Sequence, residues 1–179
     1  MAKQNTSPTE GQDTKECVTR RKFLLAGGTV GAAVLLTTPG IQGEVWAATT
    51  KYPRKKVASL SKLKTDVPVE FDYPDADSPA MLVKLGVAAG GGIGAGSDVV
   101  AFSTLCTHMG GAMDGTYKAK HKGLGPCPLH LTTFDLTRHG IMIAGHATES
   151  LPQVVLEVDG DAIYATGVMG LIYGKSSNV

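Results

Sequence analysis

Two short stretches, Cys106-Thr107-His108 and Cys127-Pro128-Leu129-His130, decide what this chain can be. Each pairs one cysteine with one histidine, and residues 109–126 separate them. Two thiolates and two imidazoles make a complete set of four ligands for a soft or borderline metal. When two histidines replace two of the four usual cysteines of an iron–sulfur cluster, both histidines bind one iron and both cysteines the other. We therefore predict that Cys106, His108, Cys127 and His130 hold a [2Fe–2S] cluster between two loops.

A zinc ion is the main alternative, because zinc also accepts two cysteines with two histidines. Zinc fingers, however, usually pair Cys with Cys and His with His, at other spacings. The spacing therefore favours the iron–sulfur cluster, and zinc stays open as the alternative on sequence alone. Two buried cysteines that merely lie near two histidines are a third, weaker interpretation.

Both ligand stretches, with Gly110 after the first, resemble the cluster-binding loops of Rieske proteins. Thr132 and Phe134 stand where many members carry a hydroxyl residue and a tyrosine, which implies that both lie beside the cluster. Many Rieske proteins also have one further cysteine in each loop, joined as a disulfide, and here Gly111 and Leu129 hold those positions. The resemblance therefore implies an intact ligand set without the disulfide.

A more specific resemblance runs through residues 101–105, 145–152 and 170–174, which are similar to the small subunit of arsenite oxidase. It covers about residues 80–175. The resemblance implies a non-catalytic electron-transfer subunit of an oxidoreductase that converts arsenite to arsenate. Its partners would be a large molybdopterin subunit, with an iron–sulfur cluster of its own, and a c-type cytochrome or cupredoxin that accepts the electrons.

Two alternatives use the same cluster in other complexes. The family also includes the Rieske subunits of related molybdenum enzymes such as iodate reductase, in which electrons would flow in the opposite direction. A Rieske protein of a quinol-oxidising complex is the other alternative. That class is expected to retain a membrane anchor and the loop disulfide, and the second feature is missing here.

The first 47 residues have the pattern of an export signal. Arg20-Arg21 precede a short apolar run at 23–36, and Val45-Trp46-Ala47-Ala48 follow, with small residues at 47 and 48. A basic stretch, a short apolar core and a small-residue cleavage site are typical of secretory signals, and the paired arginines are typical of the twin-arginine route. We expect cleavage after Ala47, loss of Cys17 and a periplasmic mature protein. An uncleaved membrane anchor is the alternative.

The remaining chain predicts an all-β fold. Residues 48–66 are expected to form an exposed basic linker, and 67–179 the Rieske domain. Short apolar runs of strand length lie at 81–85, 99–102, 141–144, 154–158 and 162–166. Asp159-Gly160-Asp161 predicts a hairpin turn, and the glycine stretch 90–96 predicts a hairpin loop rather than a phosphate-binding loop. We expect an antiparallel sandwich or barrel base with a small cluster subdomain at about 104–136.

Charge and the other histidines add little to this assignment. The net charge is +1, and the part after residue 47 has equal numbers of basic and acidic residues, which gives no support for nucleic-acid binding. His121 is expected to be exposed and His139 to lie in a turn. For His146 packing is the favoured role, with contact to a partner subunit as the alternative.

Overall fold

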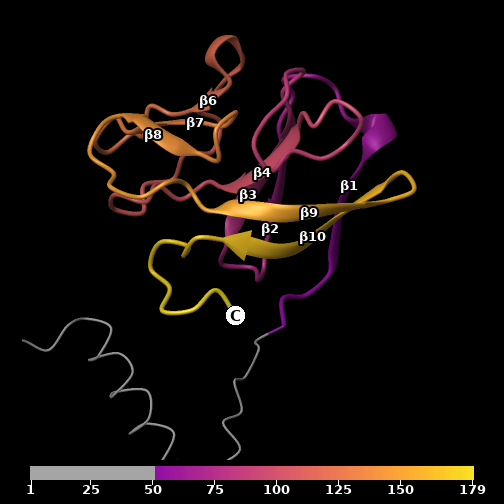
Figure 1. Ribbon diagram of the computed structural model, residues 1–179. Helices are drawn as coiled ribbons and strands as arrows, with labels where there is room; N and C mark the ends of the chain where they lie inside the picture. Colours follow the sequence, from indigo (N-terminus) through magenta and orange to yellow (C-terminus); the bar gives the residue numbers. More distant parts are fainter. Residues whose placement is uncertain (1–50) are drawn as a thin grey trace, which may run out of the picture. The chain divides into compact units, whose positions relative to one another are not determined.

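The computed structural model describes residues 51–179, and the expected signal with Arg20-Arg21 and Cys17 lies outside this range. Within it the regular elements are ten strands and two 3-10 turns, η1 (Leu60–Lys62) and η2 (Ala119–His121). The strands form two sheets (Figure 1). The predicted all-β class is therefore confirmed. In this part of the chain no helix has the length and hydropathy needed to cross a membrane.

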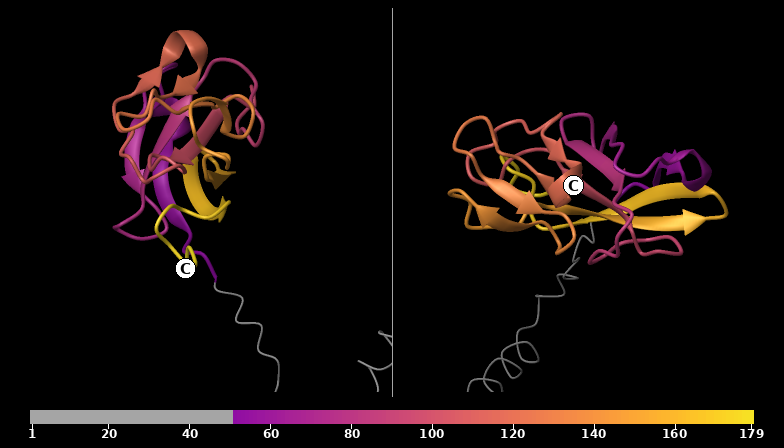
Figure 2. Two further views of the ribbon diagram at one scale, coloured as in Figure 1. Left: turned by 90° about the vertical axis from the view of Figure 1, so that its left-hand side faces the viewer. Right: turned by 90° about the horizontal axis from the view of Figure 1, so that it is seen from above.

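The larger sheet has six strands and forms the base of the domain. Its order is β1-β10-β9-β4-β3-β2, and all neighbouring strands run antiparallel. The β9–β10 hairpin extends away from the smaller sheet, as two different views show (Figures 1 and 2). The six strands are β1 (Lys55–Ser59), β2 (Val69–Asp72), β3 (Pro79–Lys84), β4 (Val99–Ser103), β9 (Gln153–Asp159) and β10 (Ala162–Met169).

Burial explains the sequence of these strands. β4 lies in the interior of the sheet and is buried at every position, and four of its five residues, 99–102, form a continuous apolar run before the buried Ser103. Strand β10 alternates buried and partly exposed residues over most of its length, because one face covers the core. Residues 90–96 connect the antiparallel pair β3 and β4, which confirms the predicted hairpin loop. The turn at Asp159-Gly160-Asp161 likewise joins β9 to β10.

The smaller sheet is inserted between β4 and β9. Its order is β5-β6-β7-β8, again antiparallel. The strands are β5 (Tyr117–Lys118), β6 (Gly123–Leu124), β7 (Thr133–Asp135) and β8 (Ile141–Ala144). Because β8 pairs with β7, the cluster subdomain extends at least to residue 144, beyond the expected end near 136.

The expected basic linker contributes a strand to the base. Residues 55–59 form β1, which pairs with β10 at the edge of the larger sheet. Lys55 and Lys56 are exposed, and the Arg54 guanidinium lies 3.5 Å from the centre of the Tyr164 ring. Charged side chains are common on edge strands because they discourage pairing with other chains. The domain therefore begins before residue 67, and the lysine-rich composition concealed its first strand.

Two apolar cores hold the domain together. One lies within the base and contains residues of β3, β4, β9 and β10, such as Leu82 and Ile163. The other joins base to subdomain and contains Val100, Phe134 and both cysteines of the ligand loops. The ligand loops are thus attached to the same core that packs the two sheets. Burying a side chain of Phe or Leu size stabilises a fold by about 1.5–3 kcal/mol.

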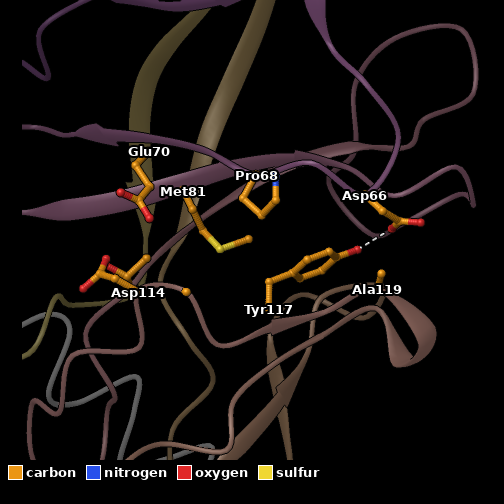
Figure 3. Close-up of a pocket in the computed structure, with 9 residues that line it drawn as sticks. Asp66, Pro68, Glu70, Met81, Asp114, Tyr117 and Ala119 are labelled. Atoms are coloured by element: carbon orange, nitrogen blue, oxygen red, sulfur yellow. Dashed lines mark hydrogen bonds between the residues drawn. The ribbon is translucent and has the colours of Figure 1, made fainter.

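A polar clasp closes one edge of the junction between the two parts. The Lys122 ammonium lies 2.7 Å from both carboxylate oxygens of Asp66, and the Tyr117 hydroxyl donates to the same carboxylate at 2.6 Å. Figure 3 shows Tyr117 pointing at Asp66, and both residues line a pocket beside them. The volume of this pocket is about 360 Å³. The hydrogen bond from Lys122, then that from Tyr117, lowers the pKa of Asp66, against a smaller opposing effect of burial. The clasp connects the inter-loop segment to the base.

Candidate metal centre

Two loops of the same local construction contain the four predicted ligands. In the first loop the Cys106 N–H donates to the Gly111 carbonyl at 2.9 Å, and the Gly110 N–H donates to the Cys106 carbonyl at 2.8 Å. In the second loop the Leu131 N–H donates to the Cys127 carbonyl at 2.9 Å. Each cysteine therefore closes its own turn through its backbone. This fixes the direction in which its side chain leaves the loop.

The structure brings the four predicted residues together. Both cysteines are 1% exposed, and both are free thiols. The rings of His108 and His130 meet edge to face with their centroids 4.6 Å apart. His108 is half-buried and His130 is exposed. The sulfurs thus lie in the interior while the imidazoles lie toward the surface, an order that allows a cluster to be held between them.

The surroundings of Cys106 disfavour its thiolate form. Burial raises its pKa, and the neighbouring Cys127 thiol adds to the increase. The His108 backbone N–H and the Thr132 hydroxyl donate to the sulfur and act in the opposite direction. Because thiolates are the metal-binding form, iron would supply the charge that this buried pair lacks.

An unsatisfied nitrogen supports the fit of a metal cluster. Nδ1 of His108 is buried and has no hydrogen-bond partner within residues 51–179. Leaving a buried polar atom unpaired is costly, so such an atom needs an explanation, and a metal ion bound at this nitrogen is one. In the same range no three or more His, Cys, Asp or Glu side chains converge on one metal position.

Thr132 and Phe134 both lie in the buried part of this site. Thr132 is completely buried, and its hydroxyl donates to the Cys106 sulfur. The His146 backbone N–H donates to the Thr132 oxygen at 3.2 Å, so the hydroxyl proton remains free for the sulfur. Phe134 is also completely buried, in the apolar core that contains both cysteines. Its place directly beside the cluster stays a prediction.

Packing joins the two loops where other members have a disulfide. A Cβ atom added at Gly111 would lie 2.7 Å from the Cys127 sulfur and 3.1 Å from Cγ and Cδ1 of Leu129. The Leu129 side chain therefore occupies the space beside Gly111, and a larger residue there would push into the cluster site. The two loops therefore contact each other at Gly111 and Leu129. These are the positions where many Rieske proteins have the two cysteines of the loop disulfide.

Sequence reasoning missed the third chain segment at the site. The His146 ring lies 5.7 Å from the ring of His108 and 6.4 Å from that of His130, centroid to centroid. A Cβ at Gly110 would lie 2.5 Å from the Tyr173 ring, so the carboxyl-terminal segment packs on the first loop. These contacts link residues far apart in the sequence, and no local sequence pattern predicts them.

The other two histidines have local roles. His121 is exposed on η2, as expected. His139 has a positive φ of 53° in a turn, as expected, and its Nδ1 lies 2.8 Å from Oε1 of Gln153. Neither extends the candidate metal centre.

Comparison with known proteins gives the family. The model of the Rieske [2Fe–2S] domain matches residues 54–155. "Iodate reductase subunit IdrB" of Pseudomonas sp. (strain SCT) is 59% identical over 94% of this chain and 88% of the relative. The protein of the same name from Denitromonas iodatirespirans is 61% identical over 92% of this chain and 88% of that relative. The solved structure of the soluble domain of Rieske protein II from Sulfolobus acidocaldarius has a TM-score of 0.58 at 26% identity. The match covers 65% of this chain and 78% of that structure's chain. This chain belongs to the Rieske [2Fe–2S] protein family.

Proposed function

We propose that this chain is the electron-transfer subunit of a molybdopterin oxidoreductase of the iodate reductase type. The identity of about 60% to two iodate reductase subunits, over nearly the whole length of both chains, carries the proposal. The sequence resemblance to the small subunit of arsenite oxidase had favoured arsenite as the substrate of the complex. The relatives instead favour the alternative, iodate, and electron flow toward the large subunit.

The residues of the site divide the work of holding the cluster. Cys106 and Cys127 would bind one iron from the interior, and His108 and His130 the other from the surface. When bound, the cluster exchanges one electron at a time. Two neutral imidazoles in place of thiolates reduce the negative charge of the centre and raise its potential, to about −150 to +300 mV for the class. Thr132 and the His108 backbone N–H would stabilise the negative charge on the Cys106 sulfur.

In this proposal the chain holds one redox group, the cluster. The electron donor and the electron acceptor are therefore both partner proteins. A large subunit with molybdopterin and a further iron–sulfur cluster would reduce the substrate. A c-type cytochrome or a cupredoxin would deliver electrons to the Rieske cluster one by one. The proposed location is the periplasm, reached by the twin-arginine route suggested by Arg20-Arg21.

Affinity purification of this chain from its native host tests the proposal. The complex should contain a large molybdopterin subunit and should reduce iodate with a reduced electron donor. A matched complex with His130→Ala should retain the large subunit and lose electron delivery through the chain. Arsenite oxidation without iodate reduction would restore the arsenite assignment. Recovery of a quinol-oxidising complex instead would overturn both.

A further inference from the structure

Three imidazoles, not two, form the exposed face of the candidate centre. His146 is exposed, and its ring is tilted by 32° to the ring of His108 and nearly perpendicular, at 85°, to that of His130. Its centroid lies 5.7 and 6.4 Å from theirs. His146 is therefore a non-ligand ring close to both imidazoles predicted to bind iron. Any partner that approaches His108 and His130 from this side also meets His146.

The backbone fixes His146 in this place. Its N–H donates to the buried Thr132 hydroxyl at 3.2 Å. The preceding residue, Gly145, has a φ of 104°, and a Cβ there would lie 2.4 Å from the Thr132 Cα. Only glycine permits so close an approach of two backbones. The third segment is thus attached to the second ligand loop. The fold therefore sets the position of the His146 backbone beside that loop.

The three segments that carry the histidines are themselves uncharged, although the exposed Glu149 follows the third segment directly and its carbonyl accepts a hydrogen bond from Thr107. Residues 105–113, 127–134 and 139–148 contain no Lys, Arg, Asp or Glu. Four large apolar side chains in these segments are at least half exposed: Met109 at 55%, Leu129 at 55%, Leu131 at 67% and Ile143 at 54%. Large exposed apolar side chains gathered around one feature mark an interaction surface. We call these four residues the apolar collar.

Leu131 is held in an unfavourable conformation within this collar. Its φ is +62°, in the left-handed region that costs a non-glycine residue about 1–2 kcal/mol. The most exposed large apolar side chain of the described chain is thus presented beside His130 from a strained backbone. Strain of this kind persists where the surrounding structure and a function maintain it.

We propose that His146 is the contact through which an electron passes between the cluster and the catalytic partner subunit, which the apolar collar seats. The inference rests on the proposed function. In this proposal one electron would pass from the bound cluster to an iron–sulfur centre of the partner, so that the cluster would be oxidised and the partner's centre reduced. No bond or proton changes at His146. The imidazole fills the space between the ligand rings and the partner and shortens the gap the electron crosses.

The chemistry of the collar selects the permanent subunit over a diffusing cytochrome or cupredoxin. Partners that meet by diffusion gain speed from charges that steer their encounter. Depletion of charged residues and enrichment in apolar ones are features of the buried core of lasting interfaces. A collar without charge therefore fits a subunit that stays bound. The soluble carrier would dock elsewhere on the complex.

The test compares His146→Ala, His146→Phe and the control His121→Ala, which changes another exposed histidine. Each isolated chain is first examined by electron paramagnetic resonance and protein-film voltammetry. The co-expressed complexes are then followed by single-turnover kinetics of electron transfer between the cluster and the large subunit. For His146→Ala we expect an unchanged spectrum and a slowing of at least about tenfold, equivalent to about 1.4 kcal/mol of activation free energy. His146→Phe, which restores a ring, should recover most of the rate.

Each other outcome overturns the inference. Transfer at the wild-type rate in His146→Ala shows that the electron does not pass through this residue. An altered spectrum with slow transfer shows that His146 instead maintains the cluster. Equal slowing in His121→Ala shows an unspecific effect. Faster dissociation of the soluble carrier, with normal transfer between subunits, assigns the collar to that carrier. A wild-type complex without inter-subunit transfer would instead refute the proposed function, so the two failures are distinguishable.

Discussion

Replacing Thr132 by valine should lower the reduction potential of the cluster. The Thr132 hydroxyl donates to the Cys106 sulfur and accepts the His146 N–H at 3.2 Å. Reduction adds negative charge to the cluster, so a donor to sulfur stabilises the reduced state. A neutral hydrogen bond is worth roughly 0.5–1.5 kcal/mol. For one electron, about 59 mV corresponds to a tenfold change in equilibrium constant. The expected decrease is therefore about 20–65 mV, and in the upper half of that range because Thr132 is completely buried.

Protein-film voltammetry of the isolated chain measures the potential directly. Thr132→Ser is the matched control, because it keeps the hydroxyl and should keep the potential near that of the wild type. The electron paramagnetic resonance spectrum of each variant shows whether the cluster is intact. If Thr132→Val keeps an intact cluster at the wild-type potential, the Thr132 hydroxyl does not donate to the sulfur. The account of the second ligand loop would then be wrong.

Four further predictions follow from the same residues. Phe134→Tyr should raise the potential by about 20–65 mV, the value of one added hydrogen bond, and an unchanged potential in a folded variant would show that this ring is not beside the cluster. His130→Ala should abolish the Rieske-type electron paramagnetic resonance signal, and two irons with two labile sulfides per wild-type chain should be found by analysis; stoichiometric zinc without sulfide would contradict this. Changing Arg20-Arg21 to lysines should block export, as fractionation would show. Asp66→Asn should lower the melting temperature at neutral pH, because the pKa of Asp66 is lowered by folding. The stabilising pairing with Lys122 is present above the ordinary carboxyl pKa. It is lost as the pH falls through the pKa of Asp66 in the folded protein. The difference between wild type and variant should therefore shrink in acid.

Local sequence patterns predicted those strands whose own residues show which face is buried. Strand β10 alternates, and Asp159-Gly160-Asp161 marks its hairpin, so both could be predicted. β1 could not, because Lys55 and Lys56 give an edge strand the composition of a linker. The run at 141–144 was predicted as a strand, but its sheet depends on pairing with β7, which no single segment encodes.

The candidate site divides in the same way. Spacing alone indicated the four candidate ligands, because each cysteine–histidine pair lies within one short stretch of sequence. His146 belongs to a third segment, and only the folded chain places its ring beside those of His108 and His130. The hydroxyl of Thr132 was predicted from its position in the motif, but its second hydrogen bond, from the His146 N–H, depends on the same folding. Residues that act through long-range contact therefore need the structure.

The missing disulfide and the proposed export route are physically compatible. Twin-arginine export, as proposed here, requires a chain that folds around its cluster in the cytoplasm, where disulfides rarely form. The loops must then be held by contacts that need no oxidation. In this chain Leu129 fills the space beside Gly111, and Tyr173 packs on Gly110. The Thr107 hydroxyl also donates to the Glu149 carbonyl at 2.9 Å. Because these contacts form on folding alone, the cluster loops would be complete before export. The same contacts would persist in an oxidising compartment, since neither free cysteine of residues 51–179 is exposed to react.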